Sequence, residues 1–259
     1  MNTPYPSSQP YRRTHRTPAR YVIASPLSII KPRPVASPCI RATDLTLVFQ
    51  GHTLCQHLDF TVAQGGITVL VPQDNLYKAA LFELLAGRCS PVTGQCLIHG
   101  HVTDEMPVDV RQQIALLENG ERLYEVMTIG QTAIFFSGCF PGWRDDRFRD
   151  LMGELDLTRR MKIANLSHQQ RVLIALALLL ARNPQLLVID DWIGGLDPAS
   201  RAFIYQALHR YRSESTTTLL LGNHTGLNRE YIDHLVLMGQ RTALTIPSAE
   251  LAGASAPAR

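Results

Sequence analysis

One stretch near the middle of the chain constrains the fold most, because an apolar helix, a buried strand and two acids follow one another there. Ser167 is a favoured helix N-cap, and residues 172–181 are apolar on almost every face, as in a helix enclosed in a large core. Residues 186–189 are continuously apolar, which predicts a strand covered on both sides in a parallel sheet. That strand is followed directly by two carboxylates, Asp190 and Asp191.

Adjacent acids at the end of a buried strand indicate a ligand site. Open α/β sheets bind their ligands outside the carboxyl ends of their strands. A core helix and a core strand joined by a polar turn would also explain the apolar runs. The residues Gly194-Gly195-Leu196-Asp197, which follow the two acids, favour the ligand site over this simpler interpretation.

The same stretch resembles the ATP-binding cassette of the ABC ATPases. Leu166, Ser167 and Gln170 match three positions of the family's LSGGQ signature. Residues 187–191 resemble its Walker B strand, and residues 194–197 resemble its D-loop. Because several motifs agree in order and spacing, the resemblance is specific for the family, and it covers roughly residues 42 to 240.

The resemblance implies a P-loop NTPase-like α/β cassette with a mostly parallel core sheet, an antiparallel β edge subdomain and a helical insert. Strands alternating with helices along the chain agree with an α/β layer architecture. The alternating patterns at residues 44–49 and 57–62 predict the antiparallel edge. A strand at 67–71 precedes a helix at about 77–86. Further strands are expected at residues 95–99, 113–117, 217–221 and 234–238, and further helices within 128–157 (broken at Pro141-Gly142), at 199–212 and at 228–233.

The expected domain organisation is a tail, one cassette and an extension. Residues 1–40 hold eight of the sixteen prolines and are interpreted as a disordered basic tail. The cassette is expected at residues 41–240, with its helical subdomain at about 120–165, and residues 241–259 are expected to form a C-terminal extension.

Charge is distributed unevenly between the tail and the cassette. Residues 1–41 carry a net charge of +7 and contain no acidic residue. Because the whole chain carries +3, residues 42–259 carry −4. An inert tail is the favoured interpretation, followed by a partner-binding arm, for which anionic lipid is one candidate. Nucleic acid is disfavoured because the cassette itself is acidic.

Cysteine use and hydropathy indicate the compartment. The five cysteines form no CxxC pair, which favours a reducing cytosol without disulfides or a zinc site. The longest apolar run, residues 172–181, falls short of the ~18 residues that span a bilayer, so membrane contact requires a partner.

The Walker A loop departs most from the family pattern. Of the positions of GxxxxGK[ST], which run here from Pro72 to Ala79, only Lys78 is retained. Pro72 has no N–H to offer a phosphate, and Tyr77 replaces a glycine where positive φ is expected. Asp74 adds a negative charge, and Ala79 lacks the hydroxyl that would coordinate Mg²⁺. These losses together predict weak binding of ATP and Mg²⁺.

The remaining site residues are implied by the resemblance. Both signature glycines are replaced, by His168 and Gln169, and Asp191 stands where the family has its general-base glutamate. Several assignments have a structural alternative: Ser167 as an N-cap, Phe49 as a core residue and Lys78 as a solvated lysine. Glu118 is an alternative to Asn119 in the alignment with the family. The implied roles are catalysis for Asp191 and His224, metal contact for Asp190 and Asn119, and nucleotide contact for Lys78, Phe49, Asn119, Ser167, Gln170 and Asp197.

Two functions are therefore weighed. The first is the ATPase subunit of a bacterial ABC transporter with impaired ATP binding and hydrolysis. The second is a pseudo-cassette that regulates or scaffolds a partner without ATP turnover. Either would act with an integral membrane permease, as a homodimer or as a heterodimer with an active cassette. The expected location is cytoplasmic, peripheral on the inner face of the cell membrane.

Overall fold

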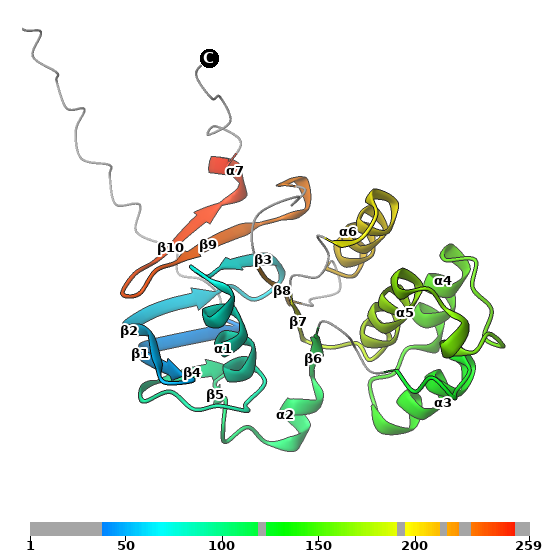
Figure 1. Cartoon of the computed structure of the whole chain (residues 1–259), viewed down its shortest axis with the longest axis horizontal. Helices are drawn as coiled ribbons and strands as arrows, with labels where there is room; N and C mark the ends of the chain where they lie inside the picture. Colours follow the sequence, from blue (N-terminus) through cyan, green and yellow to red (C-terminus); the bar gives the residue numbers. More distant parts are fainter. Residues whose placement is uncertain (1–37, 119–122, 191–194, 213–216, 223–228, 252–259) are drawn as a thin grey trace, which may run out of the picture. The chain divides into compact units, whose positions relative to one another are not determined.

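The computed structural model describes residues 38–118, 123–190, 195–212, 217–222 and 229–251 (Figure 1). The pattern of contacts within the chain separates two units, residues 1–34 and residues 35–259. All the described residues belong to the second unit. Within them the strands form two sheets, a four-stranded sheet with the order β2-β1-β4-β5 and a six-stranded sheet with the order β10-β9-β3-β8-β7-β6.

The six-stranded sheet is mostly parallel. β3 pairs in parallel with both β8 and β9, β7 pairs in parallel with β6 and β8, and only β10 runs antiparallel to its neighbour β9. The interior strands β3 and β7 are buried on both faces, which explains their continuous apolar runs. The strands are β3 (Gly66–Val71), β6 (Ile114–Leu117), β7 (Leu186–Asp190), β8 (Thr217–Leu221), β9 (His234–Met238) and β10 (Ala243–Pro247).

The four-stranded sheet is the antiparallel edge that the sequence predicts. Its first two strands are longer than expected and meet in a two-residue turn, Gln50-Gly51. Both turn residues have positive φ, 50° and 79°, as tight hairpin turns of the primed types require. The strands are β1 (Ile40–Phe49), β2 (His52–Val62), β4 (Thr93–Ile98) and β5 (His101–Val102).

The first helix, α1 (Asn75–Leu85), packs against the antiparallel sheet. It contacts β1 and β4, and its apolar residues share one core with that sheet. A second core surrounds α5 (His168–Ala181), which is apolar on almost every face because it is enclosed by helices and by the parallel sheet. The fold is thus an α/β P-loop NTPase-like cassette, as predicted.

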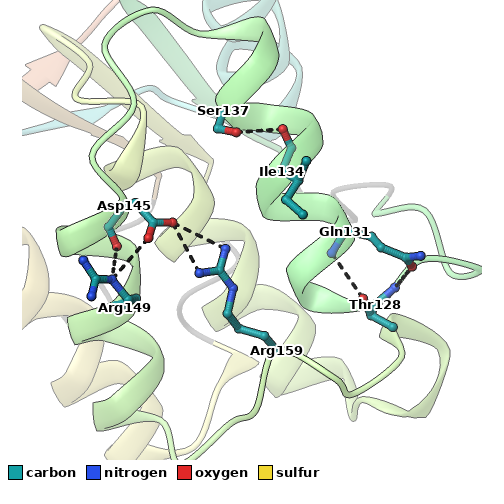
Figure 2. A network of polar contacts seen from close by, with 7 residues as sticks. All are labelled: Thr128, Gln131, Ile134, Ser137, Asp145, Arg149 and Arg159. Carbon is teal, nitrogen blue, oxygen red and sulfur yellow. Dashed lines mark hydrogen bonds and ion pairs between the residues drawn. The ribbon is translucent and has the colours of Figure 1, made fainter.

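The helical subdomain contains the expected interruption. α3 (Ile129–Cys139) ends before Pro141-Gly142, and α4 (Asp145–Glu154) begins after it. Figure 2 shows the polar contacts that fix both helices. A capping box joins Thr128 and Gln131, and Asp145 contacts the guanidinium groups of Arg149 at 3.2 Å and Arg159 at 3.4 Å.

The remaining helices are short, apart from α6. The prediction of a helix at residues 228–233 was wrong, because the described residues of this segment form only the 3-10 turn η3 (Arg229–Tyr231). Asp233 instead accepts a hydrogen bond of 2.7 Å from the N–H of Ile67, which ties this segment to the start of β3. The other helices are α2 (Val108–Gln112), η1 (Ile163–Asn165), α6 (Pro198–Arg212) and α7 (Ser248–Leu251).

In the part of the chain that the structure describes, the helices are too short or too polar to cross a lipid bilayer.

Candidate functional site

The structure brings two predicted site residues into direct contact. Lys78 lies in the first turn of α1, and Asp190 is the last residue of β7. The Lys78 Nζ and the Asp190 Oδ1 are 2.8 Å apart, and the two side chains are only 20% and 22% exposed. The residues expected at the Walker lysine and Walker B positions therefore form a half-buried ion pair.

The connection from β3 to α1 is much shorter than a Walker A loop. Only Pro72, Gln73 and Asp74 lie between the strand and the helix. In a GxxxxGK[ST] motif the loop continues to the glycine before the lysine, whereas here that position already lies within the helix. Across residues 72–79, all of which the structure describes, no φ is positive. Backbone N–H groups are consequently not gathered by a glycine-rich turn here.

Asp74 explains why α1 begins so early. It is the N-cap, with extended backbone, and its Oδ1 accepts a hydrogen bond of 2.8 Å from the N–H of Tyr77. Its carbonyl oxygen accepts another, of 3.1 Å, from the N–H of Lys78. A carboxylate at this end of a helix satisfies a free N–H and interacts favourably with the helix dipole.

Tyr77 occupies the position of the second Walker glycine, but its ring is turned into the core. The residue is only 1% exposed and belongs to the apolar cluster between α1 and the antiparallel sheet. Its buried hydroxyl interacts with the Cys55 thiol, a weak hydrogen-bonding group. Burial raises the pKa of this hydroxyl well above its usual range, and the neighbouring Cys55 thiol raises it further. The buried ring of Tyr77 therefore packs α1 against the core, and a glycine at this position would make no such contact.

The signature residues Ser167 and Gln170 bond to each other. The Ser167 Oγ accepts from the Gln170 N–H at 3.2 Å, and the Gln170 Oε1 accepts from the Ser167 N–H at 2.9 Å. This is a capping box at the start of α5, the structural alternative that the sequence offered for the serine.

Asp197 is likewise used as a helix cap. Its carboxylate accepts hydrogen bonds from the Ser200 N–H at 2.9 Å and the Ser200 Oγ at 2.7 Å at the start of α6. The backbone hydrogen bond from Ser200, followed by that from its hydroxyl, lowers the pKa of Asp197.

Phe49 ends β1 and packs, partly buried, against the core of the antiparallel sheet. Three other predicted site residues, Asn119, Asp191 and His224, lie outside the described residues.

Sequence reasoning did not identify an apolar groove beside the helical subdomain. It encloses about 380 Å³. Among the described residues that line it, Arg182 carries a positive charge. This side chain stacks over the Phe140 ring at 3.7 Å and donates to the carbonyl of Ile114 at 3.0 Å. The only sequence signal was the density of aromatic residues near Phe140. The lining residues are Ile114, Leu116, Leu123, Tyr124, Thr132, Phe135, Phe136, Cys139, Phe140, Leu179 and Arg182.

The β3–α1 connection lacks most of the groups that Mg-ATP requires. Pro72 has no N–H, Ala79 has no hydroxyl for Mg²⁺, and the ammonium group of Lys78 is paired with Asp190. Asp74 places a further negative charge at the start of α1. This donor set does not fit a tightly held triphosphate.

The fold and the Lys78–Asp190 pair agree with the ABC-type cassette that the sequence predicts. Residues 55–194, more than half of the chain, match the family model described as "ABC transporter". The chain therefore belongs to the ABC transporter family, whose cassettes normally bind ATP with Mg²⁺.

Relatives and solved structures agree with this family. The chain is 27% identical over 207 residues to "Probable multidrug ABC transporter ATP-binding protein YbhF" of Escherichia coli (strain K12), covering 77% of this chain and 35% of that protein. It is 28% identical over 213 residues to "Aliphatic sulfonates import ATP-binding protein SsuB 1" of Burkholderia lata, covering 82% and 62%. The chain thus spans less than two thirds of these relatives' length.

Two solved structures show the same fold. One is described as an ATP binding subunit of an ABC transporter, with a TM-score of 0.73 and 18% identity over 84% of this chain and 95% of that one. The other is cbiO1 from Clostridium perfringens, with a TM-score of 0.70 and 18% identity over 85% and 92%.

Proposed function

We propose that this chain is the ATP-binding subunit of a bacterial ABC transporter whose own nucleotide site binds Mg-ATP weakly and hydrolyses it slowly. The observation that carries the proposal is the three-residue connection between β3 and α1. Phosphate binding by this fold depends on a loop that points successive N–H groups at the ligand, and α1 begins before such a loop can form.

Electrostatics supports the same conclusion. Lys78 would have to leave Asp190 in order to contact a phosphate, so part of the binding free energy is spent on breaking the ion pair. Asp190 is also the residue proposed to hold Mg²⁺. A lysine and a metal ion compete for the same carboxylate, which weakens both contacts.

The partner we propose is an integral membrane permease, and the proposed contact is the apolar groove. Tyr124 and Phe135 line this groove and are 56% and 46% exposed, and Ile134 is 67% exposed on the same helix as Phe135. An amphipathic helix of the permease would bury these side chains, and an acidic residue on it would pair with Arg182. Through this contact the chain would be held at the inner face of the cell membrane. Anionic lipid could add to the attachment through the basic residues of the tail.

The second candidate is a pseudo-cassette without ATP turnover, which regulates or scaffolds an active cassette. It is favoured by the use of Ser167, Gln170 and Asp197 as helix caps, because these side chains are then engaged without nucleotide. Pairing with a competent cassette would leave one degenerate and one active site. Pairing with a second copy of this chain would leave two degenerate sites.

ATP hydrolysis by the purified chain separates the candidates. We expect slow turnover that Asp190→Asn abolishes, with thermal unfolding confirming that the variant remains folded. Equal background rates for both proteins would favour the pseudo-cassette. Turnover of about 1 s⁻¹ or more, within the ordinary enzyme range, would contradict an impaired site.

A further inference from the structure

Among the described residues, one charged side chain of the β3–α1 connection and two from the neighbouring elements α1 and β7 concern us here. Asp74 caps α1, Lys78 follows one turn later, and Asp190 pairs with Lys78. Together they carry one net negative charge. The positive charge of Lys78 is therefore already neutralised by Asp190 without a ligand, and Asp74 adds the excess negative charge.

The Asp74 carboxylate also accepts a hydrogen bond from a backbone N–H group that a bound anion would need. Its Oδ1 lies 2.8 Å from the N–H of Tyr77, at the end of the helix where free N–H groups attract anions. An aspartate at this position is an anion supplied by the chain itself. A phosphate oxygen would have to displace it and would meet its negative charge.

We infer that Asp74 is the residue that excludes polyphosphate from this site, because its carboxylate takes the place of a phosphate at the start of α1. The inference rests on the proposed function, since it explains the weak binding of nucleotide. It goes further by assigning the exclusion to one charge. The short connection then weakens binding by removing N–H donors, and the Asp74 charge acts in addition to that loss.

The substitution Asp74→Asn tests this assignment. Asparagine caps a helix about as well as aspartate, so the change removes the charge while keeping the cap. The matched control is Asp109→Asn, which removes an exposed carboxylate from the first turn of α2. The probes are inorganic pyrophosphate and Mg-ATP, titrated calorimetrically into the full chain and into both variants.

We expect the wild-type chain and Asp109→Asn to bind pyrophosphate equally weakly, and Asp74→Asn to bind it more tightly by on the order of tenfold. The triple variant Asp74→Asn with Lys78→Ala and Asp190→Ala should lose this gain, because the lysine supplies the positive charge. Equal gains in Asp74→Asn and Asp109→Asn would overturn the inference, since net charge alone would then explain the binding.

The remaining outcomes separate the inference from the proposed function. Weak binding by both the wild type and a folded Asp74→Asn would overturn the inference and leave the proposed function intact. Tight binding of Mg-ATP by the wild type would overturn both. If Asp74→Asn fails to fold, Asp74→Ser provides the uncharged cap. Failure of both variants to fold would show that the carboxylate serves the fold, which also overturns the inference.

Discussion

Lys78 and Asp190 form a half-buried ion pair of 2.8 Å that ties the first turn of α1 to the end of β7. The two residues are far apart in the sequence, and they are the ones that the family resemblance assigns to phosphate and metal contact. In this chain the ion pair joins α1 to β7 in the absence of a ligand.

Breaking this pair should destabilise the chain. Lys78→Ala leaves Asp190 half-buried without its cation, and we expect a loss of about 1–3 kcal/mol in the free energy of unfolding. Urea denaturation of Lys78→Ala, Asp190→Ala and the double variant measures the coupling between the two side chains. The coupling should be at least about 0.5 kcal/mol, and additive losses would show that the pair is not formed in solution.

Tyr77 should tolerate loss of its hydroxyl but not of its ring. Tyr77→Phe removes a buried hydroxyl whose neighbour, the Cys55 thiol, is only a weak hydrogen-bonding group, so stability should stay unchanged or rise by up to about 1 kcal/mol. Tyr77→Gly restores the Walker residue but empties the core, and should cost about 3–5 kcal/mol. Thermal and urea unfolding compare the two variants. A clear loss of stability in Tyr77→Phe would mean that the contact between this hydroxyl and the Cys55 thiol stabilises the fold.

Ser167 should behave as a helix cap and not as a nucleotide ligand. Ser167→Ala is expected to cost about 1 kcal/mol of stability and to leave Mg-ATP affinity unchanged. Thr128→Ala is the matched control, because Thr128 and Gln131 form the same capping box at the start of α3. If only the Ser167 variant alters ATP affinity or turnover, the signature position acts on nucleotide and the capping role is incomplete.

The apolar groove should be needed for attachment to the permease. Phe135→Asp places a charge among the apolar side chains that line it and should abolish co-purification with the co-expressed permease. Val108→Asp is the control, since Val108 is 72% exposed on α2 and does not line the groove. Retention of the permease by the Phe135 variant would place the contact elsewhere.

The sequence predicted the core of this fold well because burial dictates it. The apolar runs at 172–181 and 186–189 have few alternatives to an enclosed helix and a central strand, and both are found. The ion pair between Lys78 and Asp190 was not predicted. The sequence placed Asp190 at the carboxyl end of a strand, but it left Lys78 as either a phosphate ligand or a solvated lysine.

The sequence predicted the start of α1 less well. The helix was expected from Tyr77 because the Walker pattern reserves the preceding residues for a loop. The structure begins it at Asn75, since Asp74 is a strong N-cap and no glycine holds the loop open. Local capping thus prevailed over the family pattern, and that competition was not weighed from the sequence.

The groove was missed for a different reason. Its cation, Arg182, reaches Ile114 and stacks on Phe140, and these residues come from three separate segments. No periodicity within one segment indicates such a contact. The hydrogen bond between Asp233 and Ile67 likewise joins residues that are remote in sequence, in the segment where a helix at 228–233 was predicted.

Calorimetric titration of the purified chain with Mg-ATP tests the central claim most directly, with Asp191→Asn used to suppress turnover. We predict a Kd in the millimolar range that Lys78→Ala leaves nearly unchanged. A micromolar Kd that is lost in Lys78→Ala would contradict the account, because it would show that the short connection and its paired lysine still hold a triphosphate.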